Sequence, residues 1–123
     1  MDLNKETQNK PYLLGRLFAI LEKIQKDAKV ENLAKKHFNG AMSQPSRSFP
    51  VLVRKIQYYL KKLPDGTKIY YDRMIQEITG KIDNFPVHLS LVEQGEFVLG
   101  YYHQKENLYM KKDEAHEEER ENA

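Results

Sequence analysis

Apolar residues in this chain recur at the spacing of an α-helix, in one segment after another. In PYLLGRLFAILEKIQKDA, residues 11–28, they follow a period of 3.6 residues. The same period returns in residues 48–63, in residues 68–82 and after residue 90. No segment alternates between apolar and polar residues as a half-buried strand would. The chain is therefore expected to be an all-α protein, a compact bundle of about five helices.

Proline and glycine mark the expected helix ends. Pro11 suits the first turn of the first helix, because its missing N–H needs no partner there. A short helix over residues 31–38 is expected to end at Asn39 and Gly40. Residues 41–48 then form a loop or an irregular helix start that contains Pro45. The sequence PDG at 64–66 is expected to be a turn before the fourth helix.

The last helix has the clearest start. Ser90 and Glu93 form a capping box, in which each side chain bonds the backbone N–H of the other residue. The residues expected on its inward face, together with Gly95, are Leu91, Val98, Tyr102 and Tyr109. Because glycine in a helix costs roughly 1 kcal/mol relative to alanine, Gly95 and Gly100 both predict close packing.

Length and charge suggest the domain organisation. A chain of 123 residues suits one domain. Residues 1–10 are expected to be a flexible N-terminus and residues 11–110 the helical bundle. Residues 111–123 contain six acidic and three basic residues, and are expected to be a disordered acidic tail.

Several classes of protein are excluded or disfavoured by composition. The chain has no cysteine, so it has neither disulfides nor thiolate metal sites. No apolar run approaches the roughly 20 residues of a membrane span. The N-terminal segment MDLNKETQNK lacks the apolar core of a signal peptide. We expect a soluble, cytoplasmic protein.

Signatures of catalysis are weak. No Gly-rich loop precedes Lys-Ser or Lys-Thr, as a phosphate cradle would require. The histidines show no i, i+4 pair that could place two metal ligands on one helix face, and His88 and His103 are expected to be hydrogen-bonded or surface groups. Glu93 and Glu96 lie in first helical turns, where the helix dipole favours acids. We expect no enzymatic activity, no cofactor and no metal.

Basic residues concentrate in residues 29–62, where eight basic residues accompany one acid, Glu31. Arg47, Arg54 and Lys61 are seven residues apart, which places them roughly 10 Å from one another along one helix face. This face lies opposite the apolar residues of the 48–63 helix, whereas an ordinary solvated face mixes charges of both signs. Cations in a row with a nearby ring predict binding of a nucleic-acid strand without sequence reading. The candidate nucleic-acid-binding residues are Arg47, Arg54, Lys55, Tyr58, Lys61, Lys62, Lys35 and Lys36.

Three segments carry a family resemblance: PYLLGRLFAILEKIQ, SFPVLVRKIQYYLKKL and FPVHLSLVEQGEFVLGYYHQKENLY. They resemble the C-terminal region of the large subunit of the subtype I-C CRISPR surveillance complex, Cascade. The likeness extends from about Pro11 to Tyr109. A chain of this length that begins with Met at the start of that region resembles the small subunit that this system translates separately.

The resemblance implies a non-catalytic helical subunit that lies beside the guide RNA and stabilises the R-loop through backbone contacts with DNA. Target cleavage would belong to a recruited helicase-nuclease. The implied partners are the backbone and large subunits, the guide RNA, target DNA with its displaced strand, and a second copy of the chain. The resemblance supplies no list of contact residues.

Two alternatives remain open. In the first, the chain is a purely architectural subunit whose basic face docks on acidic protein surfaces. In the second, it is a small DNA-binding regulator, which needs a recognition helix and base-specific contacts. The basic face contains no Asn and only Gln57 nearby, so it is poorly suited to base reading.

Overall fold

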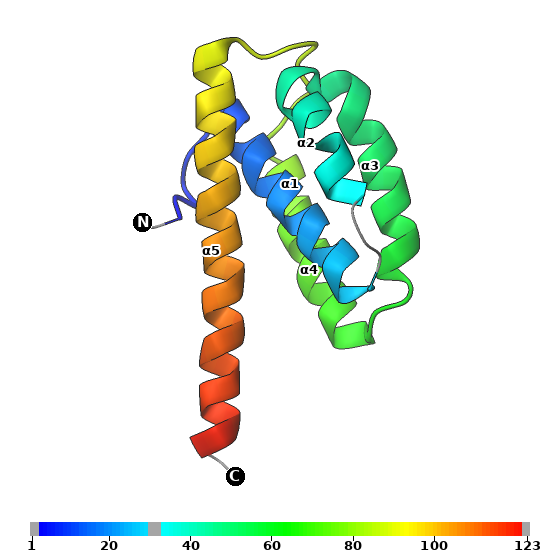
Figure 1. Ribbon diagram of the computed structural model, residues 1–123, viewed down its shortest axis with the longest axis vertical. Coiled ribbons are helices and arrows are strands. Elements are labelled where there is room, and N and C mark those ends of the chain that lie inside the picture. Colours follow the sequence, from blue (N-terminus) through cyan, green and yellow to red (C-terminus); the bar gives the residue numbers. More distant parts are fainter. Residues whose placement is uncertain (1–2, 30–32, 122–123) are drawn as a thin grey trace.

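The computed structural model describes residues 3–29 and 33–121, with side chains for residues 3–29 and 36–110 (Figure 1). These residues form five helices and no strand, which confirms the predicted all-α bundle. No helix within the described ranges is long and apolar enough to cross a membrane. The helices are α1 (Lys10–Asp27), α2 (Leu33–Ser43), α3 (Pro45–Leu60), α4 (Asp65–Thr79) and α5 (Leu91–Glu121).

Helix α1 is the centre of the molecule. The Asn9 side chain caps it by accepting a hydrogen bond of 2.9 Å from the Tyr12 N–H, and Pro11 lies in the first turn as predicted. Every residue from Pro11 to Leu21 is buried, including Arg16. The prediction of a single inward face was therefore too narrow, because α1 packs against each of the other four helices (Figure 1).

Helices α1 and α5 cross with their backbones in close contact at two glycines. A Cβ atom on Gly100 would lie 2.0 Å from the Tyr12 carbonyl oxygen, and one on Gly15 would lie 1.9 Å from the Phe97 carbonyl oxygen. The predicted close packing at Gly100 is confirmed. The same prediction for Gly95 is wrong, because apart from its chain neighbours and its own helix backbone no atom lies within 4 Å of the position that a Cβ atom would take there.

Two predicted boundaries differ from the structure. Helix α2 continues through Asn39 and Gly40 to Ser43, and only Gln44 separates it from α3. Gly40 instead allows close approach of α3, since an added Cβ would lie 2.9 Å from the Ser48 hydroxyl. Residues 45–48, expected to be a loop or irregular helix start, form the regular first turn of α3. Glycine thus marks a helix crossing here.

The PDG sequence at 64–66 does not form a turn between helices. Pro64 is the N-cap residue of α4, and Asp65 and Gly66 are its first helical residues. An acid in this first turn suits the helix dipole. Helix α4 ends at Thr79, before the predicted end at residue 82, and its buried side chains are those of Tyr71, Ile75 and Ile78.

The capping box at the start of α5 is confirmed. The Glu93 N–H donates to the Ser90 hydroxyl at 3.2 Å, and the Ser90 N–H donates to the Glu93 carboxylate at 3.0 Å. The predicted inward face is wrong, since Leu91 is 85% exposed and Tyr102 is 56% exposed. Among residues 91–110 of α5, the buried side chains are those of Phe97, Tyr101, Gln104 and Leu108.

Replacing Ser90 with alanine should destabilise the protein by roughly 0.5 to 2 kcal/mol, because the Glu93 N–H loses its hydrogen-bond acceptor. Thermal melts followed by circular dichroism measure this change. Ser90→Thr is the matched control, since it keeps the hydroxyl and should retain most of the stability. Equal melting temperatures for Ser90→Ala and the wild type would show that the cap does not contribute.

The predicted boundaries of the bundle, at residues 11 and 110, stay predictions. Residues 3–9 precede α1 without forming a helix, and the Lys81 ammonium donates to the Lys5 carbonyl at 2.6 Å. Helix α5 continues past residue 110 to Glu121. The side chains of residues 111–123 lie outside the described residues, so the mobility of this acidic tail stays a prediction, as does that of residues 1–10.

Candidate nucleic-acid interface

Helix α3 has a buried apolar face and an exposed basic face. It begins with Pro45 in the first turn, where the missing N–H needs no partner. The Ser46 N–H donates to the Pro86 carbonyl at 2.8 Å, which attaches the start of α3 to the segment before α5. The buried side chains are those of Pro45, Phe49, Leu52, Ile56 and Leu60, each at most 2% exposed. This apolar face fixes the direction in which the basic residues point.

Arg47, Arg54 and Lys61 are exposed on the opposite side of α3, and we call these three residues the basic row. Lys61 follows the last helical residue, but its φ of −62° and ψ of −20° continue the helical path. The row therefore extends over roughly 20 Å at 1.5 Å per residue. Within the described ranges, none of the three side chains has an ion pair or hydrogen bond. Their charges are available to a partner.

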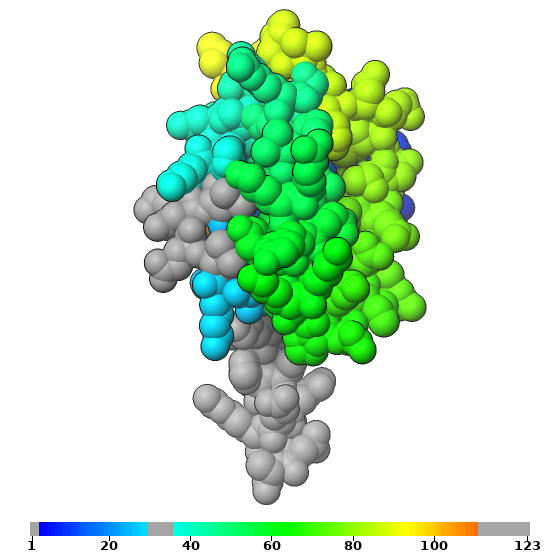
Figure 2. Space-filling view, turned by 90° about the vertical axis from the view of Figure 1, so that its right-hand side faces the viewer, coloured from blue at the N-terminus to red at the C-terminus, as the bar shows by residue number. Residues whose placement is uncertain are grey.

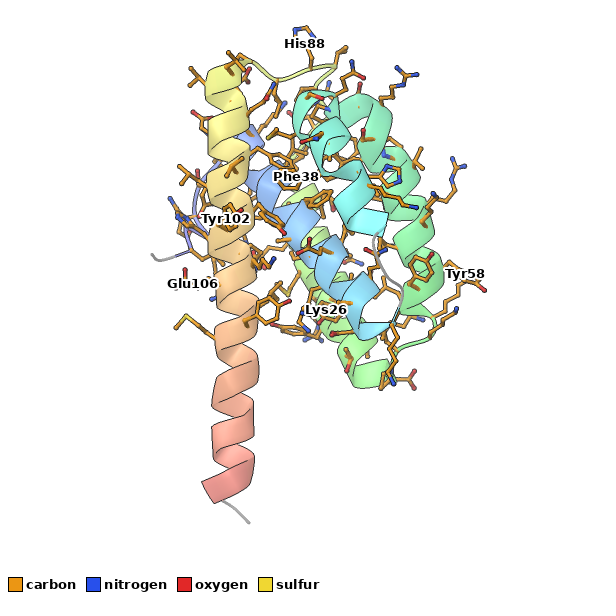
Figure 3. All side chains as sticks on the ribbon, in the orientation of Figure 1. Lys26, Phe38, Tyr58, His88, Tyr102 and Glu106 are labelled. Carbon is orange, nitrogen blue, oxygen red and sulfur yellow. The ribbon has the colours of Figure 1, made fainter. Side chains whose placement is uncertain are left out.

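Tyr58 supplies an aromatic ring within the basic row. Its side chain is 61% exposed, and it projects from α3 away from the bundle (Figure 3). The Lys62 ammonium lies 4.9 Å from the centre of this ring, and the ring of Tyr59 packs edge-on at 5.7 Å. A base stacking on Tyr58 would therefore share the ring with a cation, a combination that suits a charged strand.

Two further residues border the basic row. Lys55 is exposed, as predicted. Val51 is 43% exposed on the same side, and sequence reasoning missed it as part of this surface. Its position four residues before Lys55 on a helix was the available signal. The surface thus includes an apolar patch between cations.

Helix α2 lies beside α3, as Figure 2 shows on the face where α3 runs down the middle. Lys36 is exposed on α2. Lys35 belongs to the same helix, but its side chain lies outside the described residues. The structure therefore places the helix that carries both lysines next to the helix that carries the basic row.

Acidic residues lie beyond α3, which itself contains none. The nearest in sequence is Asp65, an exposed residue in the first turn of α4. It forms no ion pair with Lys61 or Lys62 within the part of the chain that the structure describes. The basic row keeps its charge along its whole length.

Three of the four residues considered for catalysis have structural contacts. Nδ1 of His103 is hydrogen-bonded to the Tyr12 hydroxyl at 2.8 Å, and His88 is exposed. The Ser90 amide lowers the pKa of the Glu93 carboxylate by hydrogen bonding, which is a consequence of the cap. Glu96 accepts a hydrogen bond of 3.0 Å from the Asn9 amide. Among the described residues no group of His, Asp and Glu could hold a metal ion.

Comparison with known protein families gives a match over most of the chain. A family model described as CRISPR-associated protein (Cas_Csd1) matches residues 1–109, a range that includes all of α1 to α4 and most of the packed part of α5. A search of curated proteins finds no match.

Proposed function

Because the chain belongs to the Cas_Csd1 family of CRISPR-associated proteins, we propose that it is the non-catalytic small subunit of a type I-C Cascade complex. In this role it binds nucleic-acid backbone without sequence specificity and stabilises the R-loop, above all the displaced non-target strand. Its partners are the backbone and large subunits, the guide RNA, target DNA and a second copy of itself, all in the cytoplasm.

The basic row is the observation that carries this proposal. Arg47, Arg54 and Lys61 share one exposed helix face and have no acidic partner among the described residues. Contacts from such cations to phosphates attract any strand, whatever its sequence. A surface of this kind suits a guide-directed complex, because the guide RNA must be free to specify each target.

The energetics of strand exchange make modest contacts effective. Opening an R-loop replaces a DNA duplex with an RNA–DNA duplex of similar stability. A few phosphate contacts on the displaced strand therefore shift the balance. Stacking of a base on Tyr58 would add roughly 1 to 3 kcal/mol.

A second, architectural role is favoured by the outer side of α5. Large apolar side chains are exposed there, which in a soluble protein favours contact with another protein. They belong to Leu91, Val92, Leu99, Tyr102 and Met110, each at least 49% exposed. Helices α5 and α3 lie on opposite sides of α1 (Figure 1). One chain could therefore dock on a neighbouring subunit through α5 and contact DNA through α3.

The proposal is tested by purifying the complex with and without this chain. We expect the complex that lacks the chain to form fewer R-loops on target DNA, and the purified chain to restore them. The isolated chain should also bind labelled single strands of unrelated sequence with equal affinity, and more weakly as salt rises.

Two results would contradict the proposal. A chain that never joins a complex containing guide RNA is not a Cascade subunit. A chain that restores R-loops but binds no strand at low salt has the architectural role alone.

A further inference from the structure

A groove runs between α4 and α5, with α1 as its floor. It contains two adjoining cavities of about 530 and 330 Å³, each lined by residues from all three helices. Gly66 and Tyr70 line both cavities. This α4–α5 groove is separate from the basic row, since none of Arg47, Arg54 and Lys61 lines either cavity.

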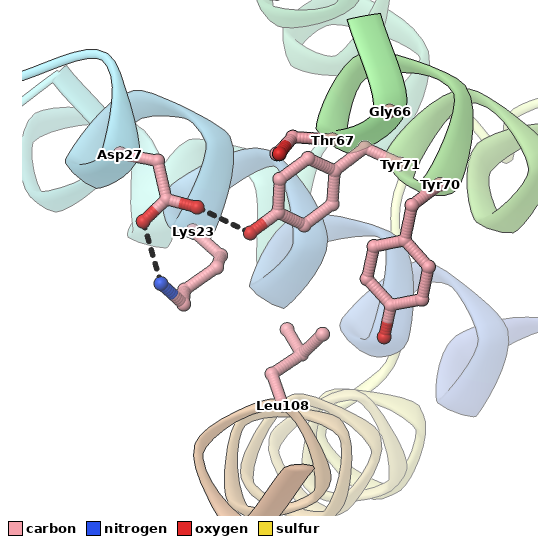
Figure 4. A pocket seen from close by; sticks show the side chains of 7 residues that line it. All are labelled: Lys23, Asp27, Gly66, Thr67, Tyr70, Tyr71 and Leu108. Atoms are coloured by element: carbon pink, nitrogen blue, oxygen red, sulfur yellow. Dashed lines mark hydrogen bonds and ion pairs between the residues drawn. The ribbon is translucent and has the colours of Figure 1, made fainter. Parts of the chain in front are cut away.

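The charged groups of the larger cavity already have partners. The Lys23 ammonium lies 2.6 Å from the Asp27 carboxylate, and the Tyr71 hydroxyl donates to the other oxygen of Asp27 (Figure 4). Burial and this carboxylate raise the pKa of Tyr71, so its hydroxyl stays protonated as the donor. Leu108 faces the same space across from Tyr70. The charged lining residues of the larger cavity, Lys23 and Asp27, therefore need no ligand to pair with.

The smaller cavity is different, because buried polar atoms around it lack partners. Arg16 is 3% exposed, and its Nε donates to the Gln104 side-chain oxygen at 2.9 Å. Nη1 of Arg16, the amide nitrogen of Gln104 and the side-chain oxygen of Asn107 have no hydrogen-bond partner among the described residues. Native proteins rarely leave buried polar groups unpaired.

The charges around the smaller cavity favour an anion. Lys5, Arg16 and Arg73 line it, whereas Glu77 is the one acid among its described lining residues. Glu77 forms no ion pair with Arg16. Burial lowers the pKa of Arg16, and the negative charge of Glu77 opposes that change without removing it. A buried cation without a paired acid is stabilised by an oxyanion that accepts hydrogen bonds from its N–H groups.

We propose that the smaller cavity binds one phosphorylated nucleotide. The phosphate pairs with Arg16, with Arg73 and Lys5 adding positive charge, and the base packs on the ring of Tyr70, which is 40% exposed. A cavity of about 330 Å³ is within the size range of small-ligand sites. The choice of a nucleotide over another oxyanion rests on the proposed function. The binding of an anion by the basic residues of the cavity does not.

The test uses the isolated chain and its variant Arg16→Met, which keeps most of the side-chain volume and removes the charge. Thymidine 5′-monophosphate and inorganic phosphate should each raise the melting temperature of the wild type in a low-salt chloride buffer. Arg16→Met should weaken binding of the nucleotide on the order of 10- to 100-fold, because charged hydrogen bonds are lost. Lys68→Met is the matched control, since it removes one exposed cation of α4 that lines neither cavity.

A second measurement identifies the source of the nucleotide and keeps the test separate from the basic row. The variant for this measurement has Arg47, Arg54 and Lys61 all changed to Glu. If a short oligothymidylate displaces the bound mononucleotide from it, the cavity binds one nucleotide of a strand. Failure to displace it assigns the cavity to a free nucleotide. Because this assay needs no Cascade complex, its outcome is independent of R-loop formation.

Three results would overturn the inference. The first is the absence of any thermal shift of the wild type by either phosphate compound. The second is an equal affinity of Arg16→Met and the wild type for the nucleotide. The third is stronger binding of glutarate than of thymidine monophosphate, which would assign the cavity to a carboxylate of a protein partner. If Arg16→Met does not fold, Arg73→Gln at the same cavity replaces it in the comparison.

Discussion

Replacing Gly100 with alanine is expected to lower the free energy of unfolding by about 3 kcal/mol or more. The added Cβ would lie 2.0 Å from the carbonyl oxygen of Tyr12. This obstacle belongs to the backbone, which cannot rotate aside as a side chain does, so α1 and α5 would have to separate. Gly15→Ala meets a similar obstacle at the Phe97 carbonyl oxygen, and it should have a comparable effect. Urea denaturation followed by circular dichroism measures both changes.

Gly95→Ala is the matched control for this prediction. Gly95 lies on the same helix, but no atom outside its chain neighbours and its own helix backbone is within 4 Å of the position that a Cβ would take. Alanine there should stabilise the protein by up to about 1 kcal/mol, because it is the better helix former. Similar losses of stability for Gly95→Ala and Gly100→Ala would show that the two helices do not cross as closely as described.

Changing Arg47, Arg54 and Lys61 together to Glu should weaken R-loop formation by roughly 10- to 100-fold, if each phosphate contact contributes up to about 1 kcal/mol. The effect should be the same for unrelated guide sequences, because phosphate contacts carry no sequence information. The log–log slope of affinity against salt should flatten by roughly 2, at about 0.7 for each phosphate of a single strand that is no longer neutralised. R-loop formation by the assembled complex, titrated with salt, measures both quantities.

The control for this variant changes Lys10, Lys29 and Lys68 to Glu, which alters the net charge equally but leaves the basic row intact. The slope of affinity against salt for this control should stay close to that of the wild type. The control loses only the general attraction between a positive chain and DNA. Parallel slopes for the wild type and the basic-row variant would show that the row is ordinary solvated surface. Normal folding with failed assembly would instead show that the basic face docks on a neighbouring protein subunit.

The sequence was most informative where one helix face is apolar and the other is charged. In α3 the buried residues and the basic row alternate with helical period, so both the helix and its orientation followed from the pattern. The capping box at Ser90 was equally readable, because it depends on two residues three apart. Local rules decide these features, and a single sequence contains them in full.

The orientation of α5 could not be read in the same way. Apolar residues occur around the whole helix, so no face was distinguished by hydropathy. The side that packs on α1 includes Gln104, which is fully buried, while Leu91 is exposed. Gly100 allows α5 to approach α1 because it has no side chain. Gly95 is also a glycine within α5, but no other helix packs against it. Tertiary contact selected between two glycines that look alike in sequence.

The α4–α5 groove was out of reach for a different reason. Its lining residues come from α1, α4, α5 and the segment before α1, and no spacing rule connects Arg16 with Gln104. The available signal was a single arginine inside the apolar run LLGRLF. That signal alone did not distinguish a buried cation from one that reaches solvent along its flexible stem.

The central position of α1 affects how the chain reaches its native state. The most extensive helix contact in the molecule joins α1 to α5, the two helices farthest apart in sequence. During synthesis α1 emerges long before α5, with apolar side chains on every side that only later helices cover. Long-range closure of this kind slows folding relative to bundles in which neighbours pack in order. A growing chain therefore leaves apolar side chains of α1 uncovered until α5 has left the ribosome.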